Sequence, residues 1–194
     1  MEPNSLLKLW IVDCLTGKRA AVDGERFRIG SAPTSDLRVG NGGDEQELMH
    51  ITRVAKSFFL YPGKSGGSLV FDGQEVPSMG IQDNSEHTVV VGGYPFLLRA
   101  GDGTTDDWAS TINPAQWYVL KRGESKAVGP LSQEELPLLA NGERGQIILF
   151  CTGMKQMGFF PHQIMPRMKS QAAAGPSDEV SPSAAQATEA PVVF

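Results

Sequence analysis

Apolar residues in the first hundred positions occur in short bursts that alternate with polar residues and are separated by turn-forming pairs. Among these pairs, Asp23-Gly24 and Asp72-Gly73 suit tight hairpins because both residue types tolerate positive φ. The bursts predict strands at residues 6–13, 26–29, 37–39, 48–53, 57–61, 68–71, 87–91 and 95–99. Short strands with a turn every 8–12 residues indicate an antiparallel β-sandwich or barrel. In the strand at 87–91, apolar residues occupy positions that point to both faces of the sheet. We therefore expect both faces of this strand to be buried.

A different pattern begins at residue 116. Residues 116–120 are rich in aromatic and β-branched side chains, which predicts a strand, and a second short strand ends at Leu131. Ser132 is followed three residues later by Glu135, a capping box that predicts the start of a short amphipathic helix. A buried strand at 147–150 and a closing segment at Phe159 and Phe160 complete a β-β-α-β-β unit.

The chain is therefore expected to be mainly β, with an N-terminal antiparallel β-sandwich followed by a small α+β domain. We place the sandwich at residues 1–103, a linker at 104–115 because this stretch lacks apolar periodicity, and the small domain at 116–167. Residues 168–194 are rich in Ala, Ser and Pro and poor in large apolar side chains, so we expect a disordered tail.

Charge and cysteine content narrow the function classes. The formal net charge of -5 argues against a general nucleic-acid or anionic-membrane surface, because such surfaces need concentrated Lys and Arg. No run reaches the ~20 apolar residues needed to span a bilayer, so we expect a cytoplasmic protein without membrane insertion. The two cysteines, Cys14 and Cys151, lie in different expected domains, which predicts two buried thiols and no disulfide framework.

The residue types that can act in catalysis are not arranged in any known catalytic motif. The histidines His50, His87 and His162 have no Cys, His or carboxylate at metal-ligand spacing. A nucleophile elbow, a phosphate loop and a dinucleotide fingerprint are also missing. We expect a protein that is not an enzyme and that binds no metal or cofactor.

The first hundred residues carry a resemblance to a known family. The apolar strand ending at Gly30, the pair Asp36-Leu37, the histidine His50 and the later glycine-rich turns occur in the order typical of that family. Residues 5–103 resemble a forkhead-associated (FHA) domain, whose loops bind a phosphothreonine peptide. The resemblance assigns the peptide-contacting loops to Gly30, Ser31, Asp36, Glu47, His50, Gly66 and Ser68.

Three of these positions depart from the FHA pattern. Ser31 stands where the family has its phosphate-facing Arg, Glu47 where it has a Ser, and Gly66 near its ligand-holding Asn. Phosphate needs charge-assisted donors, whereas a neighbouring carboxylate repels it. We therefore expect a degenerate, phosphate-independent FHA-like module. Arginines on nearby strands could replace the missing phosphate-facing Arg, because a guanidinium that reaches in from another position can donate the same pair of hydrogen bonds. These candidates are Arg28, Arg38 and Arg53.

The second block resembles a bacterial GYF-like domain over about residues 116–165, on Trp117-Tyr118, Gly129-Pro130, Leu149 and a closing aromatic-Pro pair. In that family an aromatic groove binds proline-rich peptides, which are already extended and lose little entropy on binding. The resemblance assigns the groove to Trp117, Tyr118, Pro130, Leu131 and Phe160. Trp117 and Phe160 are expected to be mostly core, which leaves Tyr118 as the better candidate for contact.

The predicted function is a non-enzymatic adaptor in protein–protein interaction, in which each module binds a segment of a partner protein. Two alternatives stay open. One is a bacterial signalling protein that binds phosphothreonine peptides through a replacement arginine. The other is a structural component of a membrane-associated or secretion assembly.

Overall fold

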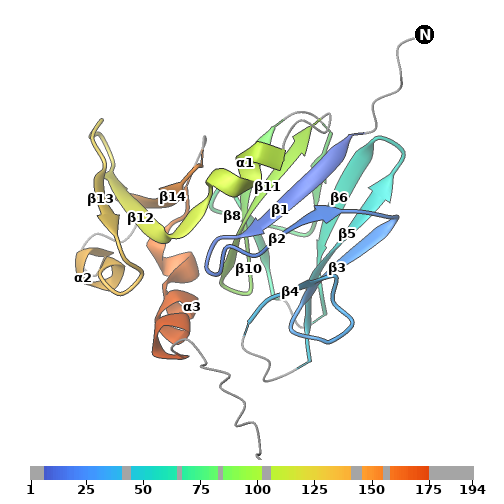
Figure 1. Ribbon diagram of the computed structural model, residues 1–194, viewed down its shortest axis with the longest axis horizontal. Coiled ribbons are helices and arrows are strands. Elements are labelled where there is room, and N and C mark those ends of the chain that lie inside the picture. The colour runs from blue at the N-terminus through green and yellow to red at the C-terminus, as the bar shows by residue number, and fades with distance from the viewer. Residues whose placement is uncertain are drawn as a thin grey trace, which may run out of the picture.

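The computed structural model describes residues 7–40, 45–64, 67–82, 85–101, 106–140, 146–154 and 158–174. These residues form a β-sandwich followed by a smaller sheet with three helices. The smaller sheet and the helices α2 and α3 stand beside the sandwich, next to the strands β1, β10 and β11 (Figure 1). The chain is mainly β, as the sequence predicts.

The sandwich consists of two sheets. The six-stranded sheet has the order β2-β1-β11-β10-β7-β8 and the five-stranded sheet the order β4-β3-β5-β6-β9. The strands of the first are β1 (Lys8–Asp13), β2 (Arg19–Val22), β7 (Leu69–Phe71), β8 (Gln74–Val76), β10 (Glu86–Val91) and β11 (Tyr94–Gly101). Those of the second are β3 (Arg26–Gly30), β4 (Leu37–Arg38), β5 (Glu47–Val54), β6 (Ser57–Pro62) and β9 (Met79–Ile81). Strands β3 and β4 pair in parallel, and the other pairs are antiparallel.

Alternation of side chains explains how the two sheets pack. On β3, Phe27 and Ile29 point inward and are buried, while Arg26 and Arg28 are exposed on the other face. The same period of two places Leu9 and Ile11 of β1 in the core between the sheets. Three strands were not predicted, namely β2, β8 and β9. Each has only three or four residues and too little apolar alternation to be recognised.

The C-terminal sheet has the order β13-β12-β14, built from β12 (Asn113–Lys121), β13 (Val128–Leu131) and β14 (Ile147–Thr152). The helices are α1 (Asp106–Thr111), α2 (Leu136–Ala140) and α3 (Pro161–Ala174). The predicted capping box is confirmed: the Glu135 amide donates to Ser132 Oγ at 3.3 Å, and the Ser132 amide donates to Glu135 Oε2 at 2.8 Å. Hydrogen bonding of the Glu135 carboxylate to the backbone amide of Ser132, and to a lesser degree to its side chain, lowers the pKa of Glu135.

Three features of the C-terminal part differ from the expectation. Helix α1 lies within the expected linker, and the closing strand is reduced to one bridge between Leu149 and Phe159. Helix α3 continues through residues 168–174, which the sequence assigned to a structureless tail. The composition of this segment predicts no helix, because it contains few large apolar side chains. The helix is stabilised by tertiary contacts instead, since Ile164 and Met168 are fully buried against the rest of the protein.

The central strands β1, β11 and β10 of the six-stranded sheet are buried on both faces. The inner face of this sheet packs against the five-stranded sheet, while Val12, Val90 and Leu97 on its outer face pack against the C-terminal part. The two-sided burial expected for residues 87–91 is thereby confirmed. We call the apolar cluster between the outer face of the six-stranded sheet and the C-terminal part the seam. Its buried members are Val12, Cys14, Leu15, Val90, Leu97, Ala109, Ile112, Trp117, Val119, Leu136, Ile147, Leu149, Cys151, Phe159, Ile164 and Met168.

Polar side chains also cross the seam. Gln133 Nε2 donates to the carbonyl oxygens of Leu15 at 2.9 Å and Pro114 at 3.1 Å. Arg19 donates to the Ala109 carbonyl at 2.8 Å, and Arg167 Nε donates to the Gly92 carbonyl at 3.0 Å. The bonds from Gln133 and Arg19 satisfy partly buried backbone carbonyls beside the apolar contact, which would otherwise be costly to bury.

Replacing Gly30 by Ala should destabilise the sandwich, because a Cβ at this position would lie 2.0 Å from the Gln46 carbonyl oxygen. The backbone must move to relieve such an overlap, which should lower the free energy of unfolding by about 1–3 kcal/mol. Gly80→Ala is the matched control, since its Cβ would meet only the Phe59 ring at 3.4 Å. Urea unfolding of both variants measures the difference. Equal midpoints would contradict the close approach of the two backbones.

Asp13 should make stability depend on pH. Its carboxylate is fully buried and accepts hydrogen bonds from the Leu15 amide at 2.9 Å and the Thr16 hydroxyl at 2.5 Å. Burial is the largest influence and raises the pKa of Asp13 above 3.8. A carboxyl with a raised folded pKa stabilises the fold below its unfolded pKa, and this contribution is lost as pH rises through the folded pKa.

The measurement compares urea midpoints of the natural chain and Asp13→Asn at several pH values between about 3.5 and about 7. The natural chain should lose stability relative to the variant as pH increases, because only the natural side chain must ionise in a buried place. Parallel pH profiles for the two proteins would contradict this assignment.

Candidate functional site

The connection between β3 and β4 is braced by Ser31. The Ser31 amide donates to the Gln46 carbonyl at 3.0 Å, and the Gln46 amide donates to Ser31 Oγ at 3.1 Å. Gly30 permits this approach because it lacks a Cβ. Ser31 therefore uses both its backbone and its hydroxyl to hold two loops together at this end of the sandwich.

Asp36 has a similar internal role. Its amide donates to the Arg28 carbonyl at 2.8 Å, and the Arg28 amide donates to Asp36 Oδ2 at 2.7 Å. These two bonds support the parallel pairing of β4 with β3, in which Ile29 lies opposite Leu37. The carboxylate of Asp36 thus positions a strand next to the loop.

Glu47 forms an ionic cluster at the start of β5. Its Oε1 lies 3.0 Å from His50 Nδ1 and 3.4 Å from a guanidinium nitrogen of Arg26. The His50 ring stacks on Tyr61, with ring centroids 5.3 Å apart. Register places Arg28, His50 and Tyr61 side by side on β3, β5 and β6. We call Arg26, Arg28, Glu47, His50 and Tyr61 the sheet-face cluster.

The three candidate phosphate-contacting arginines differ in what they contact. Arg38 Nε donates to the Ser31 carbonyl at 3.4 Å. Arg53 donates to the Leu7 carbonyl at 3.2 Å, and its guanidinium lies 5.4 Å from the Phe58 ring centroid. The exposed Arg28 side chain makes no hydrogen bond or ion pair with any residue that the structure describes. Arg28 is therefore the arginine best able to receive a ligand.

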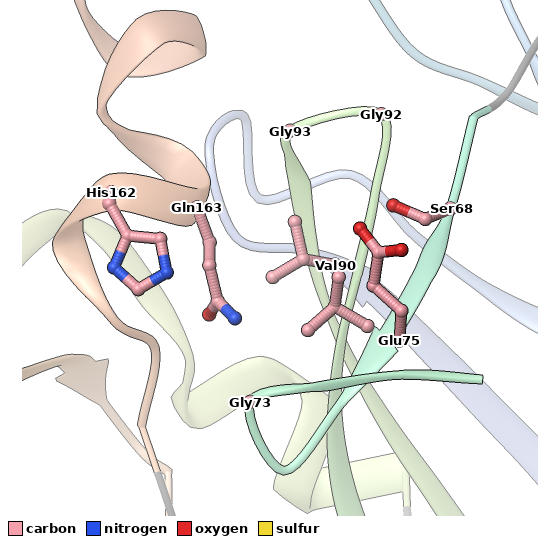
Figure 2. Close-up of a pocket in the computed structure, with 9 residues that line it drawn as sticks. Ser68, Gly73, Glu75, Val90, Gly92, Gly93, His162 and Gln163 are labelled. Carbon is pink, nitrogen blue, oxygen red and sulfur yellow. The ribbon is translucent and has the colours of Figure 1, made fainter.

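The other two predicted loop residues are placed differently. Gly66 lies outside the described residues. Ser68 is exposed and borders a cleft of about 280 Å³ between the sandwich and α3. Figure 2 shows Ser68 and Glu75 on the sandwich side of this cleft, with His162 and Gln163 on α3 across from them. Val70 and Val90 also line it, and register puts Glu75 opposite Val70.

The residues predicted for an aromatic groove are divided between the two faces of the C-terminal sheet. Trp117 is fully buried in the seam and its Nε1 donates to the Pro114 carbonyl at 2.7 Å. Leu131 is partly buried against the same cluster. Tyr118 points to the opposite face, where it stacks on Phe150 with ring centroids 5.6 Å apart. These positions agree with the expectation that Trp117 is core and Tyr118 is accessible.

Two further groove residues lie at the margins. Pro130 is exposed on the edge strand β13, after a cis peptide bond with Gly129. Phe160 is half-buried, and its ring lies so close to Gly73 of the sandwich that a Cβ there would be 2.8 Å away. Phe160 is therefore part of the contact between the sandwich and the C-terminal part.

Several residues of these sites were not identified from the sequence. Arg26 and Tyr61 join the sheet-face cluster, and their positions in the alternation of β3 and β6 could have indicated a shared exposed face. Gln46 and Gln133 act through hydrogen bonds to distant backbone groups, for which a single sequence carries no signal.

No group of three or more His, Cys, Asp or Glu residues in the described ranges is arranged to hold a metal ion. Within the same ranges, no helix combines the length and apolar character needed to cross a membrane.

No protein-family model matches the chain, and no curated protein matches it. Solved structures do match its first half. The FHA-1 structure of Mycobacterium tuberculosis Rv1747 is 17% identical and covers 49% of this chain and 97% of that chain, with a TM-score of 0.41.

Two other matches have similar values. Mycobacterium tuberculosis EmbR in complex with a low affinity phosphopeptide is 12% identical and covers 50% of this chain and 25% of that chain, with a TM-score of 0.43. The cytoplasmic domain of the T3SS sorting platform protein PscD from P. aeruginosa is 23% identical and covers 50% of this chain and 81% of that chain, with a TM-score of 0.38. The likeness to FHA domains is one of fold and extends over about half of the chain.

Proposed function

We propose that this protein is a non-catalytic adaptor whose sandwich binds a segment of a partner protein without requiring phosphate. The observation that carries the proposal is the sheet-face cluster, in which Glu47 stands where the FHA pattern has a Ser. Glu47 Oε1 lies 3.0 Å from His50 Nδ1 and 3.4 Å from a guanidinium nitrogen of Arg26, so a histidine and an arginine already share this carboxylate.

Charge opposes a phosphate at this place. A phosphorylated residue carries a charge of about -1.5 to -2 and needs donors that are not already satisfied. Glu47 would repel it, and the backbone amides of Ser31 and Asp36 already donate to the Gln46 and Arg28 carbonyls. The bonds that stiffen the loops therefore use two backbone donors that a phosphate could otherwise have accepted from.

The same stiffness supports binding of an unmodified segment. Loops that are fixed before binding lose little conformational entropy in the complex. Tyr61 remains 37% exposed beside His50 and Arg28, and Tyr and Arg are the residue types that most often dominate protein interfaces. We therefore propose that the partner contacts the face formed by Arg28, His50 and Tyr61.

Phosphothreonine recognition is the second candidate, and it depends on Arg28. This side chain is exposed and has no partner among the described residues, so it could form a fork with a phosphate that approaches from solvent. Arg38 and Arg53 are weaker candidates because each already donates to a backbone carbonyl.

A titration separates the two candidates. Matched threonine peptide libraries, phosphorylated and unphosphorylated, are selected on the full chain, and dissociation constants of the enriched sequences are measured for the natural protein and for Arg28→Ala and Tyr61→Ala. We expect phosphorylation to change affinity by less than about threefold and Tyr61→Ala to weaken binding by about tenfold.

A charge-assisted phosphate contact is instead worth about 1.5–3 kcal/mol, or roughly 10- to 100-fold in affinity. Phosphorylated peptides that bind tighter by this factor, and lose the advantage in Arg28→Ala, would overturn phosphate-independent binding. Lys126→Ala, at an exposed residue of the C-terminal part, is the control for loss of a surface charge.

We also propose that the outer face of the C-terminal sheet acts as a GYF-like site for a proline-containing segment. Register brings Tyr118 beside Phe150 and Leu120 beside Ile148, and all four side chains are half-buried. Flat aromatic surfaces of this kind suit the preformed extended shape of a proline-rich peptide. Pro130 on β13 is exposed, and Gly129 before it lies so close to Tyr118 that a Cβ there would be 2.8 Å from the ring, whereas Leu131 belongs to the opposite, seam-facing side.

Paired substitutions on β12 test this site. Tyr118→Ala should leave the protein folded and lower its free energy of unfolding by only about 1 kcal/mol. The same variant should bind a selected proline-rich peptide about tenfold more weakly. Trp117→Ala should cost about 3–5 kcal/mol in unfolding free energy because its side chain is fully buried. Urea unfolding and peptide titration give both values. Peptide affinity that is unchanged in Tyr118→Ala would show that this face is only packing.

A further inference from the structure

The cleft between the sandwich and α3 has an apolar floor that ends in a carboxylate. Register places the side chains of Val90, Val70 and Glu75 opposite one another on the neighbouring strands β10, β7 and β8. Val90 is buried, Val70 is half-buried and Glu75 is exposed on the last strand of the sheet. The floor therefore changes from apolar to anionic along one row of side chains that runs outward from the seam.

The opposite wall of the cleft is fixed by contacts within α3 and the residue before it. The Phe160 amide donates to Gln163 Oε1 at 3.3 Å, and the His162 ring stacks on the Phe160 ring with centroids 6.0 Å apart. Figure 2 shows both α3 side chains across the cleft from Glu75. The walls are thus held in place without a ligand, which lowers the entropic cost of binding one.

The charge of the cleft is negative and is not balanced by a basic residue. The Glu75 carboxylate makes no hydrogen bond or ion pair with any residue that the structure describes. A second carboxylate, that of Asp72, lines a smaller cavity of about 30 Å³ that shares Val70 and Val90 with the cleft. Among the described residues that line either space, none is a Lys or an Arg.

The arginine of α3 is engaged elsewhere. Arg167 Nε donates to the Gly92 carbonyl at 3.0 Å, and the Arg167 guanidinium lies over the Tyr94 ring. These contacts hold Arg167 beside the turn between β10 and β11, so it stiffens the rim of the cleft and leaves the charge of Glu75 to an incoming cation.

A side chain with an apolar stem and a cationic head matches this arrangement. Lys and Arg bury their methylene groups on apolar surfaces while the charged head reaches polar groups. Val90 and Val70 suit the stem, and Glu75 suits the head. Arginine fits better than lysine, because a guanidinium is more weakly hydrated than an ammonium group and donates two parallel hydrogen bonds to a carboxylate.

The surroundings of the cleft favour an arginine that belongs to a polypeptide. The α-carboxylate of a free amino acid would be repelled by Glu75 and Asp72, whereas a peptide bond carries no charge. Strand β8 is the last strand in its sheet, where the extended backbone of a partner can pair with it. The volume of about 280 Å³ is below the roughly 300–1,000 Å³ of sites for drug-sized ligands, which suits a single side chain.

We propose that this cleft is a binding site for an arginine side chain of a partner protein. The site lies on the outer face of the six-stranded sheet, whereas Arg28, His50 and Tyr61 lie on the five-stranded sheet. It is therefore a second contact surface, and its test does not depend on the function proposed for the sheet-face cluster.

The experiment titrates the full chain with N-acetyl-arginine-N-methylamide, whose backbone is blocked as in a polypeptide, and follows the backbone amides by two-dimensional NMR. We expect saturable shift changes at Gly73, Gly92 and Gly93, with a dissociation constant of about 1–10 mM for this single side chain. The equivalent citrulline compound has nearly the same shape but no charge, and it should bind about fivefold more weakly.

Glu75→Gln is the test of the carboxylate. This variant should bind the arginine compound about fivefold more weakly than the natural chain and should bind the citrulline compound equally well. Glu124→Gln is the matched control, because Glu124 is an exposed carboxylate in the connection between β12 and β13, and it should leave both affinities unchanged.

Four results would overturn the proposal. They are the absence of saturable shift changes, shift changes confined to residues outside the cleft, equal affinity for the arginine and citrulline compounds, and an unchanged affinity for the arginine compound in Glu75→Gln. Free L-arginine distinguishes the source of the side chain. It should bind more weakly than the blocked compound, and tighter binding would replace the partner protein by a free amino acid as the ligand.

Discussion

Burial of both faces of the central strands β1, β11 and β10 is the constraint on which the rest of the structure depends. Val12, Val90 and Leu97 point away from the five-stranded sheet, and each would cost about 1.5–3 kcal/mol if left in water. The C-terminal part supplies the cover through residues such as Trp117 and Ile164. A small three-stranded sheet gains stability from the same contact, because it has few apolar residues with which to build a core alone.

Period-two alternation allowed most of the sandwich to be predicted from the sequence. The strands β3, β5 and β10 have strong apolar sets, and they lie where the pattern placed them. The short strands β2 and β8 and the helix α3 could not be predicted in this way. Their conformation is determined by neighbours distant in the sequence: α3 contains Pro166 and has few apolar residues, yet Ile164 and Met168 attach it to the seam.

The candidate site was predictable to a lesser degree. The three-residue spacing of Glu47 and His50 is visible in the sequence, and the structure joins them directly. The stacking of His50 on Tyr61 depends on the register of β5 with β6, which a single sequence does not reveal. The shared apolar core of Cys14 and Cys151 was missed for the same reason, because the division of the chain into two expected domains assumed separate cores.

The seam also connects the loop end of the sandwich to the C-terminal part. The Arg167 guanidinium lies 4.8 Å from the Tyr94 ring centroid, and Arg167 Nε donates to the Gly92 carbonyl at 3.0 Å. The Tyr94 hydroxyl in turn lies so close to Gly40 that a Cβ there would be 2.7 Å away.

Movement of Gly40, which follows β4, would therefore disturb Tyr94 and, through it, α3. Two surfaces held in one packed body have a fixed separation, so a partner that contacts both gains affinity only if its own two segments match that separation. An adaptor of this kind would select its partner by the spacing of two weak contacts as much as by the chemistry of either one.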